Sequence, residues 1–236
     1  MAKKKKTTKK PTKPKVKNIL VNVVLDESGS MGSVLAETIQ GLNHYIKSLK
    51  EGKDSKKVSM SLTKFNTEVN LINVCTPIND MPFLTAVTYT PNGYTALFDA
   101  IGQSVKSVEE HIKLNKLNPK KDTQILFVIQ TDGQENASKE YNKDRILKLV
   151  EDKKAEGWTF VFLGADMDAF ALGAGFGIAQ GSTLSYKSNQ TKGMYDKLIV
   201  STMRYCSNDA NIGATVCNFF GGTTTGDKKD QDKPNA

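Results

Sequence analysis

The chain has few of the residues that hydrolytic, redox and zinc sites require. Its 236 residues include two histidines and three cysteines, and the cysteines stand far apart at positions 75, 206 and 217. An odd number of widely spaced cysteines fits neither a disulfide framework nor a zinc site. This cysteine usage is typical of a reducing compartment, so we expect a cytoplasmic protein.

Long hydrophobic runs are also absent. No run approaches 18 apolar residues, so we expect no transmembrane helix and no membrane partner. The apolar run "ILVNVVL" near the basic N-terminus is short, is interrupted by Asn22 and is followed by no small-residue cleavage pattern. A signal peptide is therefore not expected.

Charge is concentrated at one end of the chain. The formal net charge is +8, but residues 1–17 hold nine lysines and no acid, which leaves 24 basic against 25 acidic residues elsewhere. We predict a disordered Lys-rich tail over 1–17, one globular domain over 18–206 and a polar, flexible tail over 207–236. The basic tail either binds nucleic acid or an acidic surface, or only keeps the chain soluble, and the composition leaves both open.

Between the tails, strand-like and helix-like segments alternate. Apolar, β-branched runs predict strands, and apolar residues spaced three and four apart predict helices. The short "NT" join between the second and third strands predicts an antiparallel hairpin. The fold class is therefore α/β, doubly wound, with a mostly parallel six-stranded sheet, one antiparallel edge strand and helices on both faces. The strands are expected at 18–25, 57–65, 68–75, 123–130, 158–165 and 181–186, and the helices at 35–49, 97–112, 137–156, 168–175 and 190–206.

The first predicted strand ends in "DESGSMG", which begins at Asp26. A nucleophilic serine is not supported, because the position two residues before Ser30 is Ser28 where glycine is needed, and both histidines lie in predicted helices. No phosphate-binding G-x-x-x-x-G-K-[ST] pattern is present. An EF-hand calcium loop needs glycine where Met31 stands. A helix N-cap made by Ser28 or Ser30 remains an alternative.

An open oxygen site for a divalent cation explains the segment better. Asp26, Ser28 and Ser30 alternate along the loop, so their side chains can converge on one side. Thr95 precedes a predicted helix, and Asp132 follows the strand "TQILFVIQ" in a "TDG" turn. Carboxylates and hydroxyls are hard ligands that suit Mg²⁺ or Mn²⁺. Ligands in doubly wound sheets lie beyond the carboxyl ends of strands where the strand order reverses, so we expect the two Asp-containing loops to meet.

With these three segments the chain resembles the von Willebrand factor type A (vWA) family, over roughly residues 18–206. The resemblance implies a metal-ion-dependent adhesion site (MIDAS) formed by D-x-S-x-S, a threonine and the aspartate of the "TDG" turn. Here these ligands would be Asp26, Ser28, Ser30, Thr95 and Asp132. The segments "FLGADMDAF" and "GAGFGI" also look like the small single-domain vWA proteins of bacteria and phages, which would place the protein in a bacterial or host cytoplasm, or in a virion.

The resemblance also implies a function. A Glu or Asp of a partner protein would replace one water on the metal, so we expect a cation-dependent protein-binding module, with no enzymatic activity and no small-molecule substrate. Asp99, one helical turn after Thr95, is expected to support the Thr95 loop, or else to serve as a first-turn acid favoured by the helix dipole. The partner-binding rim is expected to comprise Met31, Tyr94, Gln134, Glu135 and Asn136.

Two further interpretations concern acidic residues. A metal-assisted hydrolase is a weaker alternative, because Glu135 is its one candidate for a general base. Asp166 and Asp168 form a close acid pair after the fifth predicted strand, and we interpret the pair as a helix cap.

Overall fold

The sheet is described by a computed structural model that covers residues 16–207 and 217–221. Within these residues six strands form one sheet, in the order β3-β2-β1-β4-β5-β6. β3 pairs antiparallel with β2 at one edge, and the other neighbours are parallel. The predicted sheet is therefore confirmed. The strands are β1 (Asn18–Asp26), β2 (Val58–Phe65), β3 (Val69–Pro77), β4 (Thr123–Thr131), β5 (Thr159–Ala165) and β6 (Thr183–Tyr186).

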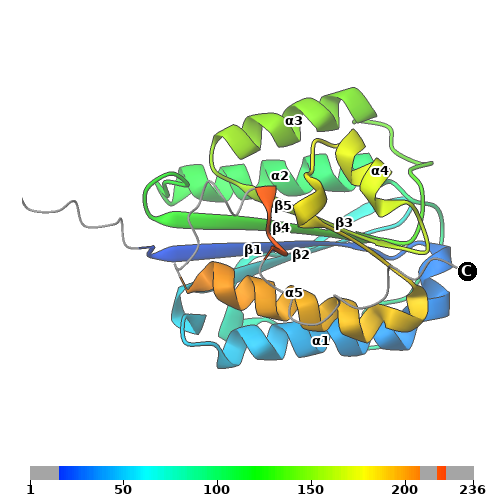
Figure 1. Cartoon of the computed structure of the whole chain (residues 1–236), viewed down its shortest axis with the longest axis horizontal. Coiled ribbons are helices and arrows are strands. Elements are labelled where there is room, and N and C mark those ends of the chain that lie inside the picture. The colour runs from blue at the N-terminus through cyan, green and yellow to red at the C-terminus, as the bar shows by residue number, and fades with distance from the viewer. Residues whose placement is uncertain (1–15, 208–216, 222–236) are drawn as a thin grey trace, which may run out of the picture.

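Helices cover both faces of this sheet. Figure 1 shows α1 (Leu35–Glu51) and α5 (Thr191–Cys206) on one face, and α2 (Leu97–Leu114), α3 (Lys143–Ala155) and α4 (Ala169–Gly175) on the other. Two separate hydrophobic clusters fill the spaces between the layers. Val21 and Val23 of β1 pack towards α1 and α5, whereas Leu20 and Val24 pack towards the other face. β1 is therefore a nearly continuous apolar run, because both of its faces are buried.

The strand order reverses between β1 and β4. β1 pairs with β2 on one side and with β4 on the other, and Leu25 stands opposite Gln130. Continuing this register by one residue brings the end of β1, Asp26, level with Thr131 at the end of β4. The loops that follow these two strands therefore meet at one edge of the sheet, as predicted for a doubly wound fold.

One helix begins later than its sequence pattern predicts. A polar helix was expected from about residue 137, but α3 starts at Lys143. The backbone N–H groups of residues 139–141 donate to the carboxylate of Asp99, so they do not enter a helical hydrogen-bond ladder. Asn142 then caps α3 by accepting from the backbone of Arg145.

The packed part of the chain extends beyond both predicted ends of the domain. Residues 217–221 are described, and Phe219 and Phe220 are buried in the cluster between α1, α5 and the sheet. Arg204 of α5 donates a hydrogen bond to the carbonyl of Phe219. At the other end Val16 is buried, whereas residues 1–15, on which the nucleic-acid interpretation rests, lie outside the described part of the chain.

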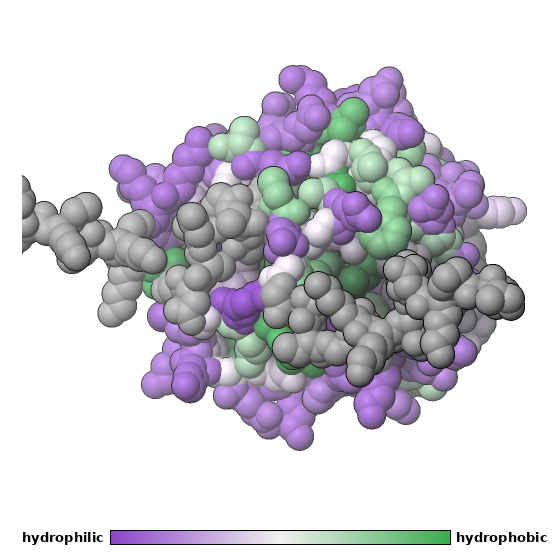
Figure 2. Space-filling model, in the orientation of Figure 1, coloured by the Kyte–Doolittle hydropathy of each residue, from purple (hydrophilic) through white to green (hydrophobic). Residues whose placement is uncertain are grey.

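Among the residues that the structure describes, no helix combines the length and the hydropathy needed to span a bilayer. Figure 2 shows hydrophilic residues over the outer surfaces of α1 and α3, with more hydrophobic residues over α4, where Phe170 is exposed. The three cysteines are unpaired, and Cys75 and Cys206 are buried.

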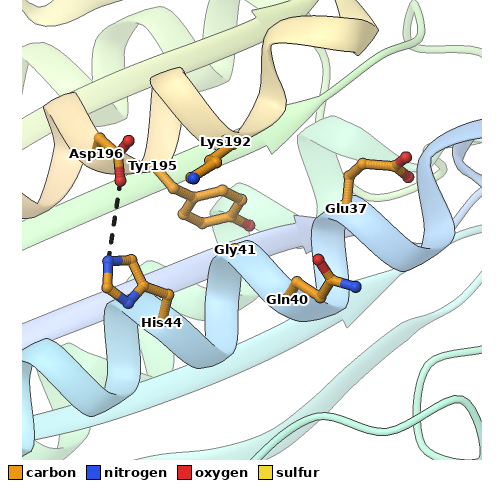
Figure 3. Close-up of a pocket in the computed structure, with 7 residues that line it drawn as sticks. All are labelled: Glu37, Gln40, Gly41, His44, Lys192, Tyr195 and Asp196. Atoms are coloured by element: carbon orange, nitrogen blue, oxygen red, sulfur yellow. Dashed lines mark ion pairs between the residues drawn. The ribbon is translucent and has the colours of Figure 1, made fainter.

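α1 and α5 approach each other closely because α1 carries a glycine at the contact. The ring of Tyr195 lies against Gly41, and a Cβ at this position would overlap the ring. A cavity of about 260 Å³ opens beside this contact (Figure 3). None of the residues lining the cavity belongs to the predicted metal site. The lining consists of Glu37, Gln40, Gly41, His44, Lys192, Tyr195 and Asp196.

The variant Gly41→Ala should lower the free energy of unfolding by about 1–3 kcal/mol, because the added methyl group forces the Tyr195 ring out of its position. Urea denaturation measures this change. Gly193→Ala on α5 is the matched control, because a Cβ there meets nothing within 4 Å. The control should stabilise the protein by about 0.5–1 kcal/mol through helix propensity. Equal effects of the two substitutions would contradict the close contact between the helices.

Candidate functional site

Asp26 lies at the end of β1 with its side chain fully buried. Its Oδ1 accepts a hydrogen bond from the backbone N–H of Ser28 at 2.7 Å, and its Oδ2 accepts one from Thr131 Oγ1 at 2.5 Å. Burial raises the pKa of Asp26 to about 6, and the nearby charge of Asp132 contributes to the rise. A carboxylate that is desolvated in this way is a favourable neighbour for a cation.

The two serines of the motif face each other and the second aspartate. The hydroxyl oxygens of Ser28 and Ser30 are 3.2 Å apart, and Ser30 Oγ donates to Asp132 Oδ1 at 2.6 Å. Ser28 occupies the N-cap of a short 3₁₀ helix (Gly29–Val34), but its side chain makes no capping hydrogen bond. α1 follows with Val34 at its own N-cap. Neither serine therefore acts as a helix cap, and the capping alternative is wrong.

Thr95 joins this group through the loop after β4. Its backbone N–H donates to Asn136 Oδ1 at 2.8 Å, and the N–H of Asn136 donates to the Thr95 carbonyl at 3.0 Å. A Cβ built on Gly133 would lie 3.3 Å from Thr95 Oγ1 and 3.8 Å from Ser30 Oγ, so the two hydroxyls flank one glycine. Among the described residues the Thr95 hydroxyl has no hydrogen-bond partner, which leaves it available for a ligand.

The donor set fits a hard divalent cation. Two carboxylates and three hydroxyls converge, and two negative charges balance one divalent ion. No group of three or more His, Cys, Asp or Glu side chains within the described residues could hold a metal by itself. A Zn²⁺ or Ca²⁺ cage of charged ligands is thus not formed in this part of the chain, whereas mixed hydroxyl and carboxylate oxygens suit Mg²⁺ or Mn²⁺.

Residues predicted to line the rim of the site divide into two groups. The side chain of Tyr94 is 67% exposed and Gln134 is exposed, so both can contact a partner. Met31 is fully buried in the cluster beneath α1, so its assignment to the rim was wrong. The 3₁₀ turn that follows Ser30 directs the methionine inwards. Asn136 is exposed, but its side-chain oxygen is occupied by the Thr95 N–H.

Glu135 was predicted to lie on the partner-binding rim, but its carboxylate binds backbone N–H groups of this chain. Its carboxylate accepts hydrogen bonds from the backbone N–H groups of Phe98, Ala137 and Ser138 at 2.7–2.9 Å. It thereby joins the start of α2 to the loop after β4. Both of its carboxylate oxygens are engaged in these hydrogen bonds, so the hydrolase interpretation loses its candidate residue.

Asp99 fits one of its two predicted roles, because it is an acid in the first turn of α2. It was expected to support the Thr95 loop, but its two oxygens accept the N–H groups of residues 139–141 at 2.8–3.0 Å. The backbone N–H of Asp99 in turn donates to Ser138 Oγ. Asp99 therefore anchors the segment between the site and α3.

Several residues that no sequence pattern singles out position the first loop. Glu27 is buried, and it accepts from Lys64 Nζ at 2.8 Å and from the backbone N–H of Thr90 at 2.7 Å. Tyr89 donates its hydroxyl to the carbonyl of Asp26 at 2.6 Å. Thr131 has a signal in the predicted topology, because it is the last residue of the strand next to β1 and lies level with Asp26 when their register is continued by one residue. Tyr89 carries no comparable signal, since its loop has no regular pattern.

The sheet and this group of candidate ligands together define a doubly wound α/β domain with an oxygen-rich site at its switch point. A family model for the von Willebrand factor type A domain matches residues 21–175. The chain therefore belongs to the vWA family, whose domains in adhesins generally mediate protein–protein interactions and are not typically enzymes. A comparison with curated proteins finds no match.

Solved structures share the fold at low sequence identity. The vWF domain of the pilus tip protein Mfa5 of Porphyromonas gingivalis has a TM-score of 0.57 at 11% identity, over 79% of this chain and 95% of that one. Manganese-loaded TRAP of Plasmodium vivax has a TM-score of 0.51 at 18% identity, over 78% of this chain and 74% of that one. Proximal thread matrix protein 1 of the mussel byssus has a TM-score of 0.53 at 16% identity, over 79% of this chain. The match spans 47% of the length of the mussel protein.

The substitution Asp99→Ala should lower the free energy of unfolding by about 1–3 kcal/mol, because it removes the acceptor of three backbone N–H groups. Hydrogen exchange should become faster at residues 139–141 in particular. Asp196→Ala on the exposed surface of α5 is the control and should change stability by less than about 0.5 kcal/mol. Unchanged exchange at residues 139–141 in Asp99→Ala would show that Asp99 does not hold this segment.

Proposed function

We propose that this chain is a divalent-cation-dependent protein-binding domain that captures a Glu or Asp of a partner protein. The observation that carries the proposal is the hydrogen bond from Ser30 Oγ to Asp132 Oδ1, because it joins the loop after β1 to the loop after β4 at a distance of 2.6 Å. Ser28 Oγ lies 3.2 Å from Ser30 Oγ on the same side, which supports a cation site shared by the two loops.

The charges of the site favour a bound cation. Asp26 is fully buried, Asp132 is partly buried, and burial raises the pKa of both carboxyl groups. A bound Mg²⁺ or Mn²⁺ would offset both charges and would offer a coordination position to a partner carboxylate. Asp26, Ser28, Ser30, Thr95 and Asp132 are the residues that would hold it.

The site is open on the side where a partner would approach. Ser30 and Gln134 are exposed, and the Tyr94 side chain stands out from the loop before α2. A Tyr side chain in such a position offers a large contact area at low cost in conformational entropy. The similarity to manganese-loaded TRAP and the interactions made by adhesin vWA domains support cation-dependent protein binding here.

Asp26→Asn and Asp132→Asn should each remove Mg²⁺ and Mn²⁺ binding in isothermal titration calorimetry, because each replaces a charged ligand by a neutral one of the same size. Asp196→Asn, which removes an exposed charge from α5, should bind the cations like the unchanged protein. Thermal denaturation should show that all three variants remain folded. Equal cation affinity in the two site variants would rule out this metal site.

Partner capture is tested separately from cation binding. In a pull-down from cells that produce the protein, the partner should be retained with Mg²⁺ and released by a chelator. Asp132→Asn should retain none of it. A partner that stays bound in the chelator and to Asp132→Asn would contradict capture through the metal, even if the cation itself binds.

A further inference from the structure

A third aspartate stands next to the candidate metal site. β5 lies beside β4 in the sheet, and Gly164 stands opposite Thr131. Extending this register brings Ala165 level with Asp132, and Asp166 follows one residue further along. Because β4 and β5 are parallel neighbours, the segments that follow them, with Asp132 and Asp166, leave the same edge of the sheet side by side.

The backbone of Asp166 is left-handed, a conformation that Asp tolerates better than most residues with a side chain. Its φ angle is +52°, in the left-handed region, and its N–H donates to the carbonyl of Tyr186 at 2.9 Å. Its Oδ2 accepts from the backbone N–H of Ser188 at 3.2 Å. Hydrogen bonding to Ser188 lowers the pKa of Asp166, so the carboxylate is charged at neutral pH. The interpretation of Asp166 as a helix cap is therefore wrong.

The other acids close to the site in sequence already have partners. Glu27 pairs with Lys64, Glu135 holds backbone N–H groups, and Asp168 caps α4 by accepting from the N–H of Ala171. Like Asp168, Asp166 is exposed, with 44% of its side chain accessible, and its side-chain partner is a lysine at the surface. Its ion pair with Lys187 is loose, at 3.8 Å, and the lysine is 74% exposed. An exposed pair of this kind contributes little and can be replaced.

We propose that Asp166 selects partners that carry a lysine or arginine close to the acidic residue captured by the metal. The inference rests on the proposed function. A divalent cation would balance Asp26 and Asp132, whereas the charge of Asp166 would be balanced only by the loose pair with Lys187, which a base of the partner can replace. A partner carboxylate alone is repelled by Asp166, whereas a base a few residues away pairs with it.

Synthetic peptides test this selectivity. Each fluorescent peptide holds one Glu in a Gly/Ser background, with Lys or Gln at one of the three positions on either side. Fluorescence anisotropy in Mg²⁺ measures binding to the full chain. The best Lys peptide should bind about two to five times more tightly than its Gln counterpart, as expected for an exposed ion pair. High salt should reduce this ratio.

Three variants locate the source of the preference. Asp166→Asn should abolish the preference for Lys while leaving Mg²⁺ affinity within about twofold. Lys187→Gln should increase the preference, because it removes the residue that competes for Asp166. Asp168→Asn removes a neighbouring charge and keeps the cap of α4, so it should leave the preference unchanged if the contact is specific to Asp166.

The outcomes separate this inference from the proposed function. Glu peptides that bind in Mg²⁺ without any preference for Lys would overturn the selectivity alone, as would a preference that survives Asp166→Asn. An equal loss of preference in Asp168→Asn would show that the preference comes from the general negative charge of this surface. It would overturn the specific contact with Asp166. If no Glu peptide binds in Mg²⁺, or if the bound peptides are not released by a chelator, carboxylate capture through the metal fails. The selectivity then fails with it.

Discussion

The hydrogen bonds that join the end of β1 to the end of β4 are the contacts on which the site depends. Thr131 donates to Asp26, and Ser30 donates to Asp132. Both contacts exist because β1 and β4 are parallel neighbours in register, so their carboxyl ends arrive at the same edge of the sheet. Burying an unpaired carboxylate is costly, and the Thr131 hydroxyl and the Ser28 N–H offset part of this cost at Asp26.

A second layer of acids fixes the loops without entering the ligand set. Glu27 holds the loop after β1 to the segment at Thr90, Glu135 holds the loop after β4 to α2, and Asp99 holds the segment before α3. Each carboxylate accepts backbone N–H groups that no helix or strand would pair. Because of these contacts the loops that carry the candidate ligands are held by hydrogen bonds, so an ion bound there would require little rearrangement of the chain.

The surface beside the site has an uneven distribution of charge. The acids near the strand ends are paired with a lysine or with backbone, but the lysine partner of Asp166 is distant and exposed, whereas that of Glu27 is close and largely buried. On this surface, selectivity for a partner would come from electrostatic complementarity near the captured carboxylate, with Tyr94 and Gln134 supplying further contact. Such complementarity affects the choice of partner and the association rate more than it affects raw affinity.

The sequence by itself determined the sheet, its antiparallel edge and the five candidate ligands, because apolar periodicity and strand ends are local patterns. D-x-S-x-S, Thr95 and the "TDG" turn can be read directly from the chain. Only the tertiary structure decided that Met31 is buried, that Glu135 holds backbone, that α3 starts late at Lys143 and that Phe219 and Phe220 pack in the core. These features depend on which backbone donors and apolar surfaces lie opposite a residue after folding, and residues distant in sequence supply them.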